Sequence, residues 1–170
     1  QRVAELVSAT GGVLDEKRAP GLVGLGSVCY EPLWVFVRAA TNFPLLCDMK
    51  GHPVAVGAEG SGTRPLALKL LAANGIRPEN TPLLPLAGTN AVAALLDGRV
   101  DAVFTVASVE AESIRHLLLD DRVAPMNFAR ANAYARRFRT LSAVRLPQGV
   151  VDAERNRPAV GVRLVSPAAT

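Results

Sequence analysis

The chain has 170 residues, of which 49% are apolar and 20% charged, so it can bury a core and is not intrinsically disordered. Its 19 lysines and arginines outnumber 15 aspartates and glutamates, a mild excess that suits a small anionic ligand but lacks the basic, aromatic-rich stripe of a nucleic-acid-binding protein. No apolar run approaches the roughly 18 residues typical of a membrane-spanning helix.

The amino-terminal part predicts two strands and contains both cysteines. Residues 21–27 and 33–38 are apolar and β-rich, which predicts two strands with a bend at Pro32. Cys29 and Cys47 can either pair in an oxidising compartment or remain free thiols. The first residues resemble no signal peptide and include no initiator methionine, so we expect a processed product or a piece of a longer protein.

After a connector over residues 39–51, strands and helices alternate. The predicted order is strand 53–57, helix 61–73 ending at Asn74-Gly75, strand 82–86, a helix to Leu96 capped by Thr89 or Asn90, strand 100–106, helix 109–119, strand 123–128, helix 129–139 and, after a loosely patterned stretch from Leu141, strand 159–165. This order predicts an α/β fold with a doubly wound, mostly parallel sheet and helices on both faces. In such sheets ligands bind at the carboxyl ends of the strands.

A glycine-rich turn precedes the first predicted helix at one such strand end. The sequence "GAEGSGTR" from Gly57 to Arg64 places Gly60, Ser61, Gly62 and Thr63 where the helix begins. A helix start exposes unpaired amides and partial positive charge, glycines allow close approach, and hydroxyl and guanidinium groups add donors. The turn therefore predicts a site for an anion, with Arg64 as a clamp.

Another interpretation of this turn is purely structural. Ser61 can simply cap the helix, and the glycines can simply reverse the chain. The turn is neither a phosphate-binding P-loop nor a dinucleotide fingerprint, since the glycine spacing fits neither. The charge of Glu59 would repel an anion, so we expect its side chain to point away or to hold a positive group of the ligand.

A second group of candidates follows the strand predicted over residues 100–106. Thr105 and Ser108 lie at its carboxyl end, where a doubly wound sheet places its ligand. Ser108 can equally cap the next helix, and Asn90 can either cap its own helix or contact a ligand. These polar side chains join the glycine turn as candidate ligand-binding residues.

Catalytic and metal-binding patterns are missing from the sequence. His52 and His116 are isolated and have no partner at metal-ligand spacing, and Ser61 has no nearby histidine to act as its base. The acidic residues read as turn and helix-end residues, Asp101 among them. We therefore expect a protein that is not an enzyme and that uses no cofactor or metal.

Four segments in order resemble one known family. "GSVCYEPLWVFVR", "DMKGHPVAVGAEGSGTRPLALKLLAANGI", "LLDGRVDAVFTVAS" and "FARANAYARRF" are similar to the TAXI-type solute-binding subunits of TRAP transporters, over about residues 22–167. The resemblance implies a type II periplasmic-binding-protein fold, in which two α/β lobes close on a small organic anion for delivery to a membrane permease.

The resemblance also implies a division of the chain and further site residues. Residues 1–45 resemble the end of the first lobe and its crossing strands, residues 46–130 the second lobe, and residues 131–170 the return segment and hinge strand. Tyr30 and Glu31 would border the cleft with Tyr134, although Trp34, Tyr30 and Tyr134 can equally be packing residues. The opening of the first lobe is missing, so we expect half of a ligand site.

The expected function is that of the solute-binding component of a TRAP-type transporter, periplasmic or membrane-tethered, which takes an amino acid or a dicarboxylate and works with the membrane permease. A ligand-sensing domain of a regulator with the same fold is the alternative. A phosphate-ester enzyme that uses the glycine turn is a third hypothesis, and no nucleic-acid partner is expected.

Overall fold

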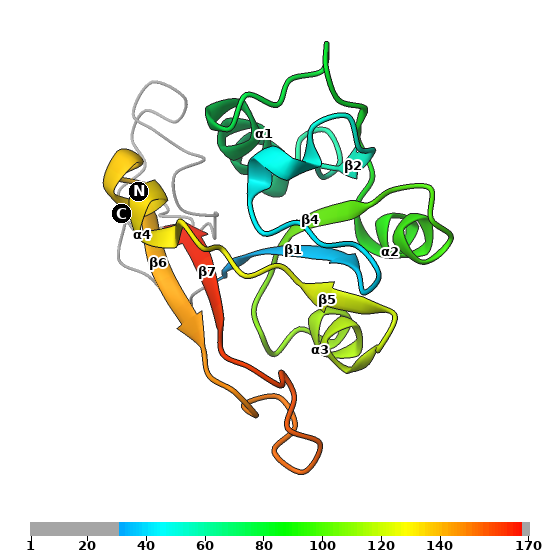
Figure 1. Ribbon diagram of the computed structural model, residues 1–170, viewed down its shortest axis with the longest axis vertical. Coiled ribbons are helices and arrows are strands. Elements are labelled where there is room, and N and C mark those ends of the chain that lie inside the picture. The colour runs from blue at the N-terminus through cyan, green and yellow to red at the C-terminus, as the bar shows by residue number, and fades with distance from the viewer. Residues whose placement is uncertain (1–30, 168–170) are drawn as a thin grey trace, which may run out of the picture.

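The computed structural model describes residues 31–167 (Figure 1), so the strand predicted over residues 21–27, Cys29 and Tyr30 lie outside the described residues. The elements are β1 (Leu33–Arg38), a 3-10 helix η1 (Leu46–Met49), β2 (Val54–Ala55), α1 (Thr63–Ala73), β3 (Leu83–Leu84), α2 (Gly88–Leu96), β4 (Ala102–Val106), α3 (Glu112–Leu119), β5 (Val123–Pro125), α4 (Ala131–Arg137), β6 (Leu141–Leu146) and β7 (Val162–Pro167). None of these helices is both long and apolar enough to cross a membrane.

The strands form one mixed sheet in the order β3-β2-β4-β1-β7-β6, with β5 paired to β1. Strand β2 runs parallel to β3 and β4, as the alternation of helices and strands predicts. The expected mostly parallel sheet needs correction, because β1 lies inside the sheet and runs antiparallel to β4, β5 and β7, and β6 runs antiparallel to β7. The α/β class itself is confirmed.

Helices α1 and α2 cover the sheet from opposite sides. The connection from β2 through α1 moves one strand outward to β3, and the connection through α2 moves back past β2 to β4. Because such crossovers are right-handed, opposite directions of travel place the helices on opposite faces. Figure 1 shows α1 and α2 on either side of β4, and both helices contact that strand.

The carboxyl end of α1 agrees with its sequence signal, whereas the amino end of α2 does not. After α1 the chain turns at Gly75 with φ of +76°, and the Ile76 amide donates to the Leu71 carbonyl, the glycine stop that the sequence predicts. The predicted cap of α2 by Thr89 or Asn90 is wrong. The N-cap is Ala87, without a side-chain hydrogen bond, because the helix begins at Gly88 and places both polar residues inside its first turn.

The core is centred on β1, whose side chains are buried on both faces of the sheet. Trp34, Phe36 and Phe104 are fully buried, and the rings of Trp34 and Phe36 stack with centroids 5.8 Å apart. The core interpretation of Trp34 is therefore confirmed. Its indole Nε1 donates to the Ala107 carbonyl at 2.9 Å, which gives the buried donor a partner and ties β1 to the segment after β4.

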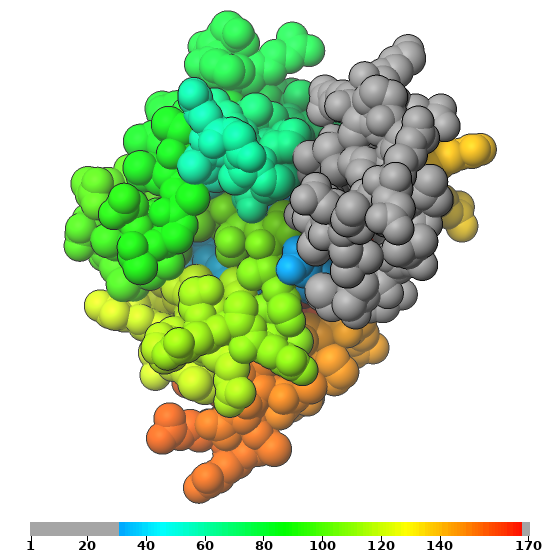
Figure 2. Space-filling model, turned by 180° about the vertical axis from the view of Figure 1, so that it is seen from behind, coloured from blue at the N-terminus to red at the C-terminus, as the bar shows by residue number. Residues whose placement is uncertain are grey.

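The stretch that begins at Leu141 is more regular than its sequence pattern suggests. It forms β6, which pairs with β7 along six residues, and the long connection between the two strands protrudes from the body of the protein (Figures 1 and 2). The pattern of β6 is weak because only its two terminal leucines are buried and the residues between them are half-buried or exposed. The strand is held by its ladder to β7 more than by an apolar face.

Candidate functional site

The glycine turn lies at the carboxyl end of β2, beside the carboxyl end of β4. The two strands are parallel, so residues 57–62 and the residues after Val106 emerge at the same edge of the sheet. A hydrogen bond joins the two segments, since the Val106 amide donates to Thr63 Oγ1 at 3.0 Å. The structure therefore brings together two groups of residues that the sequence separates by more than 40 positions.

Gly57 is the residue on which the shape of the turn depends. Its φ is +93°, and a Cβ at this position would lie 2.9 Å from Ser61 Oγ and 3.1 Å from Thr63 Cβ. Its amide donates to the Leu86 carbonyl at 3.1 Å, which fixes the turn against the segment after β3. Only glycine lets the chain fold this closely over the start of α1.

The hydroxyl of Ser61 is used inside the turn. It donates to the Ala58 carbonyl at 2.8 Å and accepts the Arg64 amide at 3.4 Å. A hydroxyl has one proton, so Ser61 can donate to an anion only by breaking the bond to Ala58. Ser61 therefore serves the turn, but it is not the helix cap that the structural interpretation expected, because the N-cap is Gly62. The expected role of its hydroxyl as a donor to the ligand needs a rearrangement.

Thr63 keeps a donor available. Its oxygen accepts the Val106 amide, so its proton remains free to point elsewhere, and no described residue accepts it. The amides of Gly62 and Thr63 likewise donate to no described residue, and the N-cap Gly62 supplies no side-chain bond. Two amides and one hydroxyl at the positive end of α1 thus have no acceptor within residues 31–167.

Arg64 and Glu59 flank these donors differently. The Arg64 side chain is half-buried and bends back so that its Nη1 donates to the Gly57 carbonyl at 3.3 Å, which keeps a positive charge against the turn. Glu59 is exposed, as is Gly60 beside it, whose φ is +78°. The Arg64 guanidinium therefore stays hydrogen-bonded to the turn, whereas the Glu59 residue is exposed.

Glu31, Thr105 and Ser108 belong to the same edge of the sheet. The Ala107 amide donates to the Pro32 carbonyl at 3.3 Å, which holds the residue before β1 beside the end of β4 and brings Glu31 to this edge. Thr105 and Ser108 are half-buried. Ser108 Oγ accepts the Glu110 amide at 3.2 Å, but α3 begins later, with Ala111 as its N-cap, so Ser108 closes a turn rather than capping the helix.

Tyr134 is not brought to this edge. Its side chain is 8% exposed, and its hydroxyl donates to Asn74 Oδ1 at 3.0 Å, at the far end of α1. An eleven-residue helix spans about 16 Å, so this hydroxyl is well separated from Thr63. Burial raises the pKa of Tyr134, which is the behaviour of a packing residue. The hydroxyl therefore serves the contact between α4 and α1.

A cluster of charges occupies the opposite, amino-terminal edge of the same strands. Asp101 precedes β4 and is 9% exposed; its carboxylate accepts from the Arg38 guanidinium and lies 2.9 Å from His52 Nδ1. The sequence indicated that His52 is isolated and that Asp101 is a turn residue, and the structure corrects both expectations. The partners lie 63 and 49 positions away, so no local signal could reveal them. Within residues 31–167 no cluster of three or more potential metal ligands forms.

Comparisons with known proteins agree with this architecture. The periplasmic aliphatic sulphonate binding protein SsuA from Escherichia coli superposes with a TM-score of 0.52 at 23% identity, over 68% of this chain and 39% of that one. The alkanesulfonate-binding protein SsuA from Xanthomonas axonopodis, bound to MOPS, has a TM-score of 0.48 at 25% identity, over 61% of this chain and 35% of that one. An L-arginine-bound amino acid ABC transporter substrate-binding protein from Streptococcus pneumoniae has a TM-score of 0.44 at 20% identity, over 58% and 38%.

The likeness to the E. coli protein shows a periplasmic-binding-protein-like fold, and the chain spans about two-fifths of the length of that protein. No curated protein matches by sequence. Residues 10–163 match the sequence model of one family, so the match extends over most of the chain. On this evidence the chain belongs to the NMT1-like family.

Proposed function

We propose that this chain is a ligand-binding lobe of an extracytoplasmic solute-binding protein, and that a small organic anion binds at the glycine turn. The observation that carries the proposal is the set of unengaged donors on Gly62 and Thr63 at the carboxyl edge of β2 and β4. This edge is where open α/β sheets bind their ligands. The chain acts as a binding module and not as an enzyme.

The ligand class follows from the donors. Two amides, one hydroxyl and the nearby Arg64 suit a singly charged head group such as a carboxylate or a sulfonate. Amino acids and dicarboxylates fit this description, and so do the sulphonates named for the E. coli relative. The half-buried Thr105 and Ser108 would contact the body of the ligand, with Glu31 near a positively charged group if the ligand carries one.

The parent system is proposed to be a TRAP-type transporter of the TAXI type, with the ligand passed to its membrane permease. The sequence resemblance supports this assignment, and it places the protein in the periplasm or tethered to the membrane. A sensing domain of a regulator is the second candidate, supported by the same resemblance of fold. A permease gene beside the parent gene would favour transport, whereas an attached kinase or DNA-binding module would favour sensing.

The experiment is an NMR titration of the isotopically labelled chain with glutamate, succinate, methanesulfonate and inorganic phosphate. We expect amide shifts at residues 60–64 and 105–108, with weak affinity because one lobe encloses less of a ligand than a complete cleft does. Amides around Arg38, Asp101 and His52 serve as the internal control, since this cluster lies at the other edge of the sheet. Shifts confined to scattered surface arginines would contradict the proposal.

A further inference from the structure

The charges of the chain are distributed unevenly. Residues 123–167 carry eight arginines, no lysine and only two carboxylates, Asp152 and Glu154. Residues 31–122 carry eight lysines and arginines against ten carboxylates. The positive charge of the described protein is therefore concentrated in the segment that contains α4, β6 and β7.

Four of these arginines surround α4 and are exposed: Arg130, Arg136, Arg137 and Arg139. None of them forms an ion pair with a carboxylate of residues 31–167, in contrast to Arg155 and Arg157, which do. The inner side of α4 is fixed by packing, because Ala131 and Tyr134 are buried and the Tyr134 ring meets Phe128 edge to face. The guanidinium groups are thus presented to solvent from a rigid support.

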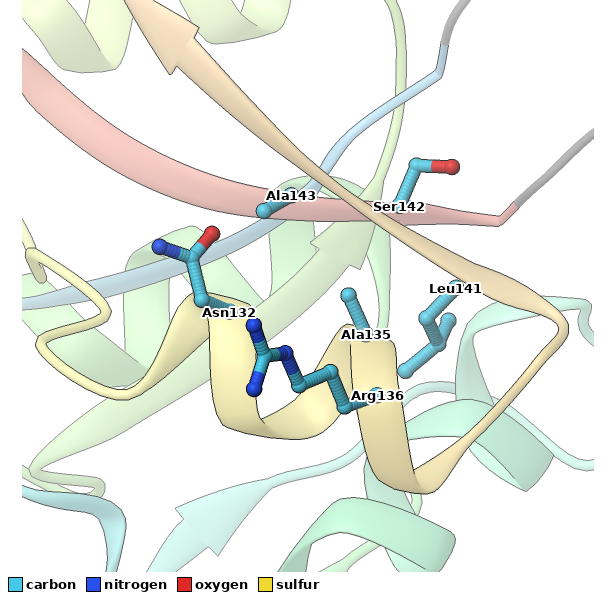
Figure 3. Close-up of a pocket in the computed structure, with 6 residues that line it drawn as sticks. All are labelled: Asn132, Ala135, Arg136, Leu141, Ser142 and Ala143. Carbon is cyan, nitrogen blue, oxygen red and sulfur yellow. The ribbon is translucent and has the colours of Figure 1, made fainter.

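A depression of about 610 Å³ lies between α4 and β6 (Figure 3) and is lined by Asn132, Ala135, Arg136, Leu141, Ser142 and Ala143. Asn132 and Arg136 are one turn apart on α4, and Figure 3 shows the Arg136 guanidinium extending along the helix toward Asn132. The two alanines contribute apolar surface to the depression, whereas Asn132 and Ser142 can hydrogen-bond to main-chain groups of a bound segment.

We propose that this surface, which we call the α4–β6 face and define by the depression and the four arginines, docks an acidic polypeptide segment. The depression is wide open, so it cannot enclose a small molecule, and one of the four exposed arginines, Arg136, lines it. Guanidinium forks match carboxylates in two-point hydrogen bonds, and arginine is enriched in protein interfaces.

A lipid surface is a poorer match for this face. Membrane association through a surface helix needs large apolar side chains that enter the acyl boundary. The strongly exposed large hydrophobic residues of residues 31–167, Val150 and Val160, lie on the connection between β6 and β7, not on α4. The proposal does not depend on the glycine turn, which lies at a different part of the fold.

The test measures binding of a fluorescent oligoglutamate peptide to the whole chain by anisotropy, with phosphatidylglycerol vesicles and single-stranded DNA as competing partners. We expect saturable, salt-sensitive binding to the peptide. The double variant Arg136→Ala/Arg137→Ala should weaken it about tenfold, which lies within the range that two exposed charge pairs supply. Arg77→Ala/Arg115→Ala, which removes the same charge from exposed sites elsewhere, should leave it within about twofold.

A third variant separates docking in the depression from simple charge attraction. Ala143→Trp changes no charge but fills the depression from the exposed side of β6, and we expect it to weaken peptide binding about as much as the double arginine variant. Equal losses from the two double variants, or an unaffected Ala143→Trp protein, would overturn the proposal. Tighter binding to vesicles or DNA than to the peptide would do the same.

Discussion

Polar groups are paired at the amino-terminal edge of the parallel strands β2 and β4, whereas several donors at the carboxyl edge have no partner among the described residues. At the amino-terminal edge, Asp101 accepts from Arg38 and lies beside His52, so buried charge is neutralised within the chain. At the carboxyl edge, Thr63 and Gly62 leave donors unpaired among the described residues. Satisfied polar groups hold a fold together, whereas unsatisfied ones are available to a ligand, so we expect mutations at the two edges to have different signatures.

The largest loss of stability is expected for a substitution of Gly57, in the glycine turn at the carboxyl edge. Gly57→Ala should lower the free energy of unfolding by about 3 kcal/mol, because a left-handed φ and a close contact with Ser61 Oγ act together. Denaturant unfolding measures this loss. Gly60→Ala is the control, since its φ is also positive but its Cβ would meet nothing within 4 Å, and we expect a loss of about 1 kcal/mol. Equal losses would show that sterics at Gly57 are unimportant.

At the amino-terminal edge, Asp101→Ala should destabilise the protein by about 2 kcal/mol, since it removes the carboxylate that accepts from Arg38 and lies beside His52. Thermal or denaturant unfolding reports the change. Anion binding, measured by the NMR titration, should stay the same in the folded variant. A loss of binding without a loss of stability would contradict the division between the two edges.

At the ligand-binding edge, Thr63→Ala should weaken anion binding by about 1 kcal/mol, or roughly fivefold, the value of one net hydrogen bond. Thr63→Ser retains the hydroxyl that accepts the Val106 amide and should restore affinity. Because the alanine variant also leaves that amide without its acceptor, stability is measured alongside. Identical affinity in all three proteins would remove Thr63 from the site.

The smallest effect concerns the buried Tyr134. Burial raises its pKa above the unfolded value near 10, so the unfolded chain releases this proton first as the pH rises. Its contribution to stability is therefore complete below about pH 10 and decreases above it. The wild-type protein should lose slightly more stability than Tyr134→Phe between about pH 9 and about pH 11 in denaturant unfolding. If the stabilities of the two proteins changed equally with pH, a raised pKa of Tyr134 would be contradicted.

Local signals predicted the helices well. Helix α1 begins within two residues of its predicted start and ends at its glycine stop, because both ends depend on neighbouring residues. The glycine turn could be found for the same reason. The cap of α2 was wrong because a helix can begin with an uncapped alanine when packing against β4 supports it. Strand β6 was missed because its stability comes from a partner strand.

The candidate site was only partly predictable. The residues at the ends of β2 and β4 were correctly grouped, since parallel strands carry their carboxyl ends to one edge. The sequence offered no means to decide that the Ser61 proton goes to Ala58, or that Tyr134 faces Asn74 instead of a ligand. The partner of each hydroxyl depends on which acceptor lies nearest to it in the folded protein.

The sequence alone establishes the α/β class, the glycine turn at a helix start and the excess of arginine after residue 122. These features depend on composition, short-range spacing and backbone preferences, which act over a few residues. Tertiary structure alone decided the antiparallel placement of β1, the pairing of His52 with Asp101 and which donors of the glycine turn find an acceptor among the described residues. Each of these depends on residues distant in the chain, and hydrogen bonds and charges act only over distances that folding creates.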